Sequence, residues 1–530
     1  MIKMVSVCLN VLLVLGTTLA TAAYSYPKPV AVSPTLAASG QYYHNIGTTA
    51  SPSIDCHIAI LGAGFAGTYA AYQLSPQFKD QICVVEKLTR IGGRIHDVSE
   101  HDGENEPLYG LGPLRLGAGQ LNMLRLAREL GVEIELDDES AAVIHQTRGV
   151  SILSKKSISN SMDLCVRVFP TLNCSGWNNK DTDRGMWKHI VDIYKKQPEI
   201  VSQYADFTLF VRALVGIEGF EFLRAMTKFQ SDFEPGNTAE TIVSPLAHMT
   251  SFRSGYFYPK GGMSQYPFRM IKRAITNGAR VFLGEAVLSI DGEPQDRFVI
   301  KTAKRTIVAD RIINAIDPFP FRNITGNVAR EIQNTAEFQS IKWTAVASVL
   351  AWWDDRFWEK SSIVRGHNVI QTSNHAECLN LIETPIYEYA KSQNATRPVY
   401  DDGVCVETWR AVLNSGNTSL LKEEIAAGMQ RVFGDVVAPW PRTVKGMIHE
   451  QAWHNVRALS KFTNEDIRRW AIQPLGNRDV SMIGEAYHPA YSSWCEGALR
   501  STMGTLQEHY DFSFPCLESQ TLTAADCATH

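Results

Sequence analysis

Apolar runs that alternate with helical patterns predict a parallel sheet near the beginning of the chain. Residues 57–61 form an apolar run long enough for a buried strand, and small and apolar residues recur at helical spacing over residues 68–74. A second apolar run covers residues 82–85 and ends in Glu86. Strand, helix and strand in this order predict a βαβ unit, and with it an α/β fold that opens on a Rossmann-like domain.

Patterns further along predict a helical insertion and a second, mixed sheet, so that the whole chain is α+β in content. Aromatic and aliphatic residues recur at helical intervals over residues 183–232, which predicts a helical core that roofs the active site. Strand patterns recur over residues 341–450 and favour a sheet beneath the substrate. Other helices are expected over residues 120–130 and 265–277, and strands over residues 279–290 and 306–317.

The turn GAGFAG, residues 62–67, joins the first predicted strand to the helix. Gly62 permits a tight turn, Gly64 lets the backbone approach a pyrophosphate, and Gly67 lets the helix pack close to the sheet. The pyrophosphate is expected at the helix N-terminus, where unpaired N–H groups and the helix dipole favour an anion. Glu86 follows 19 residues after Gly67, where a carboxylate can bind ribose hydroxyls.

Two more glycines and an arginine follow directly at Gly92, Gly93 and Arg94. The glycines add flexible backbone positions, and the guanidinium of Arg94 can pair with phosphate. This combination resembles the FAD-binding segment of the flavin amine oxidase superfamily. FAD is therefore the expected cofactor, with NAD or a structural turn as the alternatives.

Composition and charge exclude several classes of function. The 530 residues are 45% hydrophobic and 20% charged with a net charge of −4, typical of a globular protein with two domains around a large core. The sequence contains no basic run with interleaved aromatic residues, so a nucleic-acid partner is not expected. Residues 1–23 have the lysine, apolar core and small-x-small site of a secretory signal peptide, and the Pro, Ser, Thr and Ala content of residues 24–53 predicts a flexible arm. No later stretch reaches about 20 apolar residues, so no membrane span is expected.

If the protein is secreted, its cysteines are expected to form disulfides. Ten cysteines are present, of which Cys8 belongs to the predicted signal peptide. In an oxidising compartment three pairs are close enough in sequence to bridge, namely Cys165–Cys174, Cys378–Cys405 and Cys516–Cys527. Glycosylation sequons occur at Asn173, Asn323, Asn394 and Asn417 and fit the same compartment. No cluster has the spacing of metal ligands.

A second motif, YGLGPLRLGAG at residues 109–119, precedes the predicted helix 120–130. Gly-Pro-Leu-Arg before such a helix resembles the Gly-x-Met-Arg segment of L-amino-acid oxidases. The resemblance implies that Gly112 lies against the flavin and that Arg115 clamps the substrate carboxylate, which suits a bidentate guanidinium. The alternative is an arginine at a helix start that pairs with an Asp or Glu of the protein.

A third motif, SMIGEAYHPAYSSWCEGALRSTMGTL at residues 481–506, resembles the FAD-closing motif of secreted L-amino-acid oxidases, including those of sea-hare and snail secretions. By that resemblance Glu485 holds the ribityl–phosphate region, Trp494 borders the isoalloxazine, and residues 496–498 supply backbone donors. Residues 258–263 mark the family's return to the FAD domain, and the backbone of Val287 meets the adenine. The motifs near the two ends lie more than 380 residues apart, which makes their joint occurrence specific.

The resemblance covers about residues 54–506 and implies an FAD domain interleaved with a substrate domain. The predicted division is 54–150, 256–320 and 451–510 for the FAD domain, 151–255 and 321–450 for the substrate domain, and 511–530 for a tail. The expected catalytic residues are Arg115 and Trp494. The expected FAD contacts are Gly62, Gly64, Phe65, Ala66, Gly67, Glu86, Lys87, Gly93, Arg94, Gly112, Pro113, Leu114, Arg115, Val287, Glu485, Trp494, Glu496 and Ala498.

Two departures from the family pattern bear on the chemistry. Ser348 stands where these oxidases usually carry a lysine that holds a water near the flavin and is tied to oxygen reactivity. The segment after Trp453 lacks the glycine and aromatic signature that usually builds a cage around a substrate amine. That segment also has no cysteine for a covalent flavin link, so Cys495 is expected to be a plain buried thiol.

Three functions follow from these observations. The first is a secreted FAD-dependent oxidase that deaminates an L-amino acid and produces hydrogen peroxide. The second is a redox-neutral isomerase of a polyunsaturated fatty acid, in which Arg115 would still clamp a carboxylate. The third is a secreted flavoprotein without catalysis. In the enzymatic cases the partner is a small molecule with a carboxylate, and the oligomeric state stays open, a homodimer included.

Overall fold

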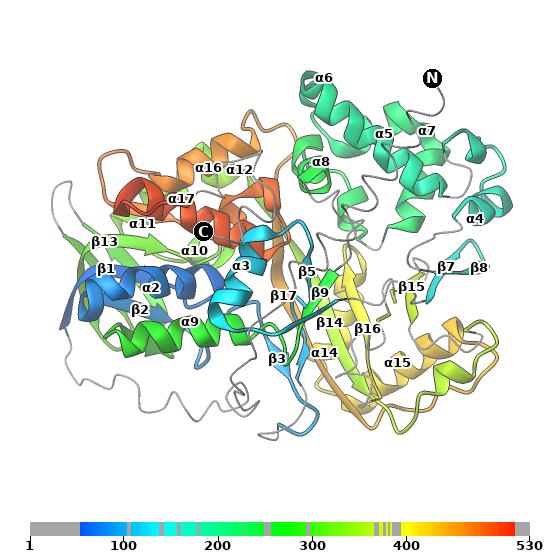
Figure 1. Cartoon of the computed structure of the whole chain (residues 1–530), viewed down its shortest axis with the longest axis horizontal. Coiled ribbons are helices and arrows are strands. Elements are labelled where there is room, and N and C mark those ends of the chain that lie inside the picture. Colours follow the sequence, from blue (N-terminus) through cyan, green and yellow to red (C-terminus); the bar gives the residue numbers. More distant parts are fainter. Residues whose placement is uncertain are drawn as a thin grey trace, which may run out of the picture.

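The computed structural model describes residues 53–102, 108–136, 142–155, 161–177, 181–227, 229–248, 256–292, 297–364, 370–374, 378–379, 382–383 and 394–514 (Figure 1). The predicted signal peptide lies outside these residues, as do the predicted arm up to residue 52 and the predicted pair Cys516–Cys527. The architecture is mixed α/β, with a large mixed sheet, a smaller antiparallel sheet and a helical insertion. This confirms the predicted fold class.

The large sheet contains the strands that the apolar runs predicted. Its strand order is β10-β2-β1-β13-β12-β11, and β18 also pairs with β13. Strands β1, β2, β10, β13 and β18 run parallel, whereas β12 pairs antiparallel with both β13 and β11. The strands are β1 (Ser53–Leu61), β2 (Ile82–Glu86), β10 (Arg280–Leu283), β11 (Val287–Asp291), β12 (Phe298–Thr302), β13 (Thr306–Asn314) and β18 (Val480–Met482). The sheet therefore draws strands from three separate stretches of sequence, although the exact domain boundaries stay a prediction.

Helices cover both faces of this sheet because its strands are apolar on both sides. One face packs against α2 (Phe65–Phe78), α3 (Leu121–Leu130), α9 (Gln265–Thr276) and α17 (Cys495–Tyr510). The other face packs against α11 (Asn327–Gln333), α12 (Ala336–Ser340) and α16 (Asn464–Ile472). Ile58 and Ile60 of β1 are fully buried in the first cluster and Leu61 in the second. Burying each such side chain contributes about 1.5–3 kcal/mol.

The smaller sheet is antiparallel, with the order β16-β14-β17. It contains β14 (Ile341–Trp352), β16 (Ala395–Asp402) and β17 (Thr443–Val456), and helices α14 (Cys405–Asn414) and α15 (Thr418–Val432) pack against it. Trp353 and Trp358 are completely buried in this second core. The strand patterns over residues 341–450 thus correspond to a real sheet.

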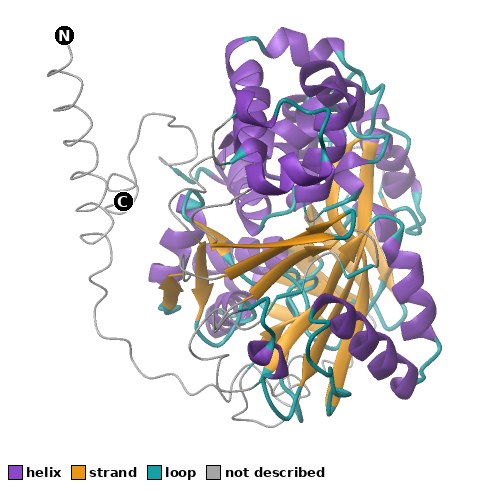
Figure 2. Cartoon of the chain, turned by 90° about the vertical axis from the view of Figure 1, so that its right-hand side faces the viewer, coloured by secondary structure: helices purple, strands orange, loops and turns teal. Residues whose placement is uncertain are grey.

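The helical insertion has its own aromatic core. It contains α4 (Ser161–Val168), α5 (Thr182–Lys196), α6 (Pro198–Gln203), α7 (Phe207–Met226) and α8 (Ala239–His248). Phe207, Phe210, Phe220 and Phe222 are at most 1% exposed, so the predicted stripe is core, as expected. Figure 2 shows these helices stacked above the strands. Shorter elements join the parts, namely β3 (Asp97–Val98), β4 (Tyr109–Gly110), β5 (Leu116–Gly117), β6 (Ile134–Leu136), β7 (Ala142–Thr147), β8 (Val150–Lys155), β9 (Tyr256–Pro259), α10 (Pro318–Phe321) and β15 (Ile370–Asn374).

Three disulfides link described residues. Cys165–Cys174 and Cys378–Cys405 confirm two predicted pairs. The third, Cys56–Cys83, joins neighbouring strands β1 and β2 and was not predicted. Cys495 is unpaired and half-buried, and burial raises the pKa of its thiol to about 12.

Candidate active site

A cavity of about 910 Å³ lies where the large sheet, the small sheet and the helical insertion meet. One part of its wall, here called the glycine-turn end, contains Gly62, Gly64, Glu86 and Val287. Another part, here called the arginine end, contains Arg115, Tyr256, Arg397, Tyr400 and Trp494. The glycine-turn end lies at the carboxyl ends of parallel strands, the usual ligand site of such sheets.

The turn after β1 has the conformation that its glycines allow. Gly62 has φ +102° and donates its N–H to the carbonyl of Val85 at 2.7 Å. A Cβ on Gly67 would lie 1.9 Å from the carbonyl oxygen of Gly62, so a side chain there is excluded. Gly64 lines the cavity with Phe65 and Ala66 of the first turn of α2. The first N–H groups of a helix have no intrahelical partner, so this wall favours an anion.

Glu86 ends β2 beside the turn. Its carboxylate accepts the N–H of Ala63 at 2.8 Å and that of Leu88 at 2.9 Å. Burial raises the pKa of Glu86, although both N–H groups oppose this shift. Each carboxylate oxygen accepts one of these two bonds, which leaves capacity for a further hydroxyl donor. Lys87 and Val287 line the same wall.

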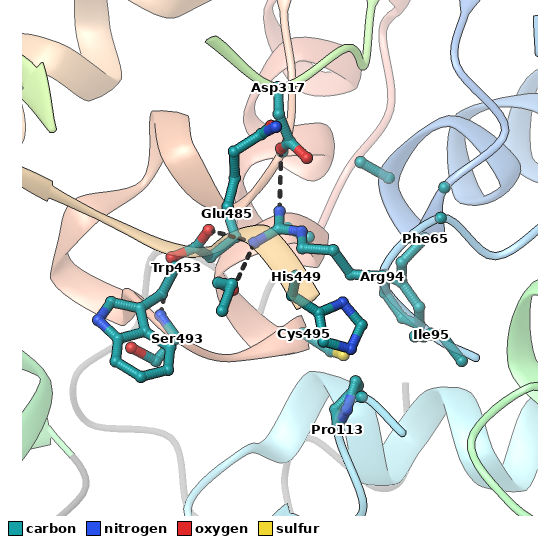
Figure 3. Close-up of a pocket in the computed structure, with 18 of the residues that line it drawn as sticks. Phe65, Arg94, Ile95, Pro113, Asp317, His449, Trp453, Glu485, Ser493 and Cys495 are labelled. Atoms are coloured by element: carbon teal, nitrogen blue, oxygen red, sulfur yellow. Dashed lines mark hydrogen bonds and ion pairs between the residues drawn. The ribbon is translucent and has the colours of Figure 1, made fainter. Parts of the chain in front are cut away.

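Arg94 lies in the middle of the cavity wall between two carboxylates (Figure 3). Its guanidinium donates to Glu485 at 2.8 Å and to Asp317 at 3.0 Å. It also donates to the carbonyl of Ala452 at 2.9 Å. Gly93 precedes it with φ +57°, a conformation that glycine adopts at little cost. Asp317 was not singled out from the sequence, because only the fold brings residues 94, 317 and 485 together.

Glu485 is the centre of a buried network. Its carboxylate accepts the backbone N–H groups of His454 at 3.0 Å and Ser493 at 2.8 Å, and the His454 ring at 2.8 Å. Burial alone would raise the pKa of Glu485, but His454 and Arg94 together lower it to about 2. Glu485 is therefore ionised, and both its oxygens already accept hydrogen bonds from the protein.

The Gly112–Arg115 segment passes directly over Arg94. A Cβ on Gly112 would lie 2.2 Å from the carbonyl oxygen of Arg94, so only glycine permits this approach. Pro113, Leu114 and Arg115 follow it along the cavity wall. His449 contacts the carbonyl of the preceding Leu111 through Nε2 at 2.9 Å, and burial lowers the pKa of His449 to about 4.

Arg115 lies among aromatic rings at the arginine end. Its guanidinium carbon is 4.2 Å from the ring centre of Tyr256, and that ring stacks on Trp494 with an interplanar angle of 7°. Glu383 lies 3.6 Å from Nη1 of Arg115, which is the acidic protein partner that the alternative expectation named. Burial would lower the pKa of Arg115, but Tyr258, Tyr256 and Glu383 raise it, so the guanidinium is charged.

Several cavity residues were missed from the sequence. Phe229 makes edge contacts with Trp453 at 5.3 Å and with Tyr400 at 6.2 Å, which gives this end an aromatic wall. Asp232 also lines the cavity, and burial, followed by repulsion from Asp402, raises the pKa of Asp232 to about 8. Arg397 and Tyr400 of β16 were missed as well. Arg397 offered a weak signal, because a charged residue is rare inside a buried strand such as residues 395–402.

Ser348 lies in β14, the middle strand of the small sheet. It pairs across β14 with Tyr400 of β16 and Met447 of β17, both of which line the cavity. Ser348 is 0% exposed, and its hydroxyl has no hydrogen-bond partner among the described residues. After Trp453, the chain continues with His454 and Asn455, both buried in the polar network.

Two expected FAD contacts lie away from the cavity wall. Gly67 packs behind the turn, and the Glu496 carboxylate accepts the amide of Asn122 at 2.6 Å and the N–H of Met123 at 3.0 Å. Ala498 does line the cavity. No group of three or more potential metal ligands occurs among the described residues. Within the same part of the chain, every helix is too short or too polar to cross a membrane.

The described residues of this lining fit FAD. No atom lies within 4 Å of the point where a Cβ on Gly64 would stand, so there is open space beside the N-terminus of α2 for a pyrophosphate. The cavity volume of about 910 Å³ suits a large cofactor with a small substrate. Glu86 supplies a carboxylate beside the turn for ribose hydroxyls.

Comparison with known proteins defines the class. Residues 65–503 match the family of flavin containing amine oxidoreductases, so the chain belongs to this family. Membership of this family implies FAD as the cofactor, as the glycine turn and Glu86 predicted.

The individual relatives are distant. The chain is 22% identical to Aplysianin-A from Aplysia kurodai, over 86% of this chain and 90% of that protein. It is 32% identical to the flavin-containing amine oxidase B of Canis lupus familiaris, but this match spans only 18% of either protein. The chain thus matches less than a fifth of the length of its amine oxidase B relatives.

Solved structures agree on the fold. A putrescine oxidase bound to putrescine superposes with a TM-score of 0.64 at 14% identity, over 87% of this chain and all of that one. The cyclohexylamine oxidase from Brevibacterium oxydans IH-35A gives a TM-score of 0.65 at 14% identity, over 86% of this chain and 98% of that one. At such identities the likeness concerns the fold.

Proposed function

We propose that the chain is a secreted FAD-dependent oxidase that converts an L-amino acid to a 2-oxo acid, ammonia and hydrogen peroxide. The single observation that carries this proposal is Arg115, which lines the same cavity as the glycine turn and lies against Tyr256. When bound in this cavity, FAD would supply the two-electron oxidation, with O2 as the final electron acceptor. A charged guanidinium among aromatic rings suits a substrate carboxylate, because its fork can donate two parallel hydrogen bonds.

The cofactor contacts belong to the same proposal. The glycine turn would receive the pyrophosphate, Glu86 the ribose hydroxyls, and the backbone of Val287 the adenine. Because the oxygens of Glu485 accept hydrogen bonds from His454, Ser493 and Arg94, we also assign Glu485 the positioning of Arg94. The other proposed contacts are Phe65, Ala66, Lys87, Gly93, Gly112, Pro113, Leu114, Trp494 and Ala498.

The aromatic wall supports oxidation of an amine. Loss of hydride from Cα requires a neutral amine, so such a site needs a dry pocket more than a dedicated base. Phe229, Tyr400 and Trp453 supply apolar surface in place of the cage that the sequence after Trp453 lacks. His449 stays neutral at physiological pH and adds no charge beside the amine.

Ser348 favours a second candidate, the redox-neutral isomerisation of a double bond in a polyunsaturated fatty acid. Ser348 is completely buried between the cavity-lining Tyr400 and Met447 of the neighbouring strands, and it carries no amine that could hold a water beside the flavin. An isomerase needs the carboxylate anchor and an apolar wall but no reaction with O2. Both candidates therefore use Arg115 and differ in the fate of the electrons.

Secretion forms part of the proposal. Residues 1–23 have the pattern of a signal peptide. Three disulfides among the described residues support an oxidising compartment, since cytosolic proteins rarely keep them.

One assay separates the candidates. The purified FAD-loaded protein is given L-amino acids and polyunsaturated fatty acids while peroxide and conjugated-diene absorbance are followed together. Peroxide with an amino acid supports the oxidase, and diene absorbance without peroxide supports the isomerase. Neither signal with any substrate would contradict both and leave a flavoprotein without catalysis.

A further inference from the structure

Two arginines share one carboxylate at the arginine end. Glu383 and Arg397 face each other across an antiparallel bridge, in which Glu383 donates its N–H at 2.9 Å and Arg397 donates its own at 2.7 Å. Their side chains form an ion pair through Nη2 of Arg397 and Oε2 of Glu383. Nη1 of Arg115 lies 3.6 Å from the other oxygen, Oε1.

The cluster carries an uncompensated positive charge, because two guanidinium groups face one carboxylate. Its side chains are largely removed from water, at 18% exposure for Arg115, 7% for Arg397 and 5% for Glu383. Among the described residues, two other carboxylates that line this part of the cavity pair with neither arginine. The pKa of Asp232 is raised by burial to about 8, so at neutral pH it is mostly protonated. Glu450 lines the cavity but pairs with Arg410.

Arg397 also has unused hydrogen-bonding capacity. Nη1 donates to the carbonyl of Gly112 at 3.0 Å, and Nη2 is engaged by Glu383. The buried Nε has no hydrogen-bond partner among the described residues. An unsatisfied buried donor costs about 1–3 kcal/mol. Arg397 lines the cavity with its guanidinium carbon 4.0 Å from the ring centre of Tyr400, so an arriving acceptor would meet this charge.

We propose that Arg397 is a second specificity-determining cation, which together with Arg115 selects anionic substrates, and that Glu383 sets the strength of this selection. The inference rests on the proposed function and deepens it, since that function needs only Arg115. The competing explanation is that Arg397 merely braces Glu383 against Gly112. The two explanations differ in what happens when Glu383 loses its charge.

Two substitutions change the net charge of this cluster in opposite directions and should therefore change carboxylate binding in opposite directions. Arg397→Gln removes the surplus charge and should weaken binding of a carboxylate ligand by about tenfold or more. Glu383→Gln keeps the side-chain shape but doubles the surplus, so the same ligand should bind about threefold or more tighter. A neutral ligand of the same shape should respond to neither. If Arg397 were only a brace, both variants would loosen the site and weaken both ligands.

The test uses the FAD-loaded protein with benzoate as the anion and benzamide as its neutral match. Both are flat aromatic ligands suited to the wall formed by Phe229, Tyr400 and Trp453. Dissociation constants come from the change in flavin absorbance, and Arg469→Gln serves as control, because Arg469 is 72% exposed on α16. Flavin content and melting temperature are measured for every variant.

Benzoate and benzamide binding to the parent protein tests the proposed function before any variant is considered. If the parent binds benzoate no better than benzamide, the carboxylate anchor itself fails. If the parent prefers benzoate and Arg397→Gln keeps that preference, only the inference about Arg397 is overturned. Should Arg397→Gln not fold, Glu383→Gln and Arg397→Lys decide: tighter benzoate binding in the first and partly retained preference in the second support the inference. Weaker binding of both ligands to Glu383→Gln would overturn it.

Discussion

Arg115 is the residue on which both candidate reactions depend, since an amino acid and a fatty acid share a carboxylate and little else. Arg115→Ala should keep the fold, because Glu383 stays paired with Arg397. Removing one partner of a buried arginine–carboxylate pair costs about 2–5 kcal/mol, so kcat/KM should fall at least about tenfold. Steady-state kinetics on the true substrate and the flavin spectrum measure the two effects.

The accompanying variant is Arg115→Lys, which keeps the charge but not the planar fork, and it should recover only part of the loss. The alanine variant should also discriminate less against the matching amide or ester. Turnover like that of the parent, or complete loss of FAD, would show that Arg115 is not the anchor.

Asp232 gives the cavity a pH dependence. Its pKa is raised by burial, and further by Asp402, to about 8. Between the unfolded pKa near 3.9 and this value, the folded state binds more protons, so Asp232 makes the protein less stable as pH rises. Asp232→Asn should therefore gain melting temperature relative to the parent by about 2 °C or more from about pH 5 to about pH 9. A difference that does not change with pH would refute this assignment.

At the scale of elements, the turn between β1 and α2 offers a matched pair of glycine variants. At Gly64 a side chain meets no atom within 4 Å and would project into the cavity. Gly64→Val should therefore fold but purify with little flavin. At Gly67 a Cβ would lie 1.9 Å from the Gly62 carbonyl oxygen, so Gly67→Ala should lose stability itself. Flavin content and circular dichroism separate these outcomes, and a yellow Gly64→Val variant would contradict the pyrophosphate site.

The disulfide Cys56–Cys83 closes a loop that contains most of β1, the glycine turn and α2. A cross-link of this length contributes about 2–4 kcal/mol, mainly by restricting the unfolded chain. Replacing both cysteines by alanine should lower the melting temperature and, because the loop carries the turn, also reduce flavin retention. The Cys165–Cys174 double variant is the control, since that pair lies in the helical insertion. Equal flavin loss in both would refute a local effect.

Hydrophobic periodicity predicted most of the helices and strands that position the site. It predicted the first and last residues of these elements less well. Strand β1 begins at Ser53 rather than near residue 57, because its first residues alternate between exposed and buried. Helix α2 continues through Pro76 to Phe78, and the hydroxyl of Ser75 donates to the carbonyl of Tyr72, to which Pro76 has no N–H to offer. The spacing of the turn and Glu86 predicted their proximity, because both follow neighbouring parallel strands.

Partnerships between distant residues could not be predicted. Arg94 meets Asp317 and Glu485 across 223 and 391 residues, and a motif gives residue types without their partners. Glu383 and Arg397 meet only because an isolated bridge brings two segments together. Cys56 and Cys83 pair because β1 and β2 are adjacent, which the strand patterns predicted but the cysteine spacing did not.

At the scale of the whole molecule, the site exists only where separate parts of the chain meet. The large sheet uses strands from residues 53–86, 280–314 and 480–482, and the cavity wall adds residues of β16, β17 and α8. No one of these stretches contains a complete lining. This arrangement explains why the substrate residues were harder to predict than the glycine turn, which is local in sequence.

Glycan occupancy at the four sequons tests whether the protein is secreted. Asn173, Asn323 and Asn417 are exposed, whereas Asn394 is half-buried and its amide donates to the carbonyl of Asp354 at 3.0 Å. A glycan is attached to that amide nitrogen, so one on Asn394 would crowd a packed contact. The protein recovered from culture medium should therefore begin near Ala23 and carry glycans at the three exposed sites, with little at Asn394.

Intact mass before and after glycosidase treatment gives the total, and peptide mass spectrometry gives the occupancy of each site. The control is Asn417→Gln, which should remove one glycan and leave the other sites unchanged. An unglycosylated protein with residues 1–23 still attached would contradict secretion, and full occupancy at Asn394 would contradict the role of its contact with Asp354.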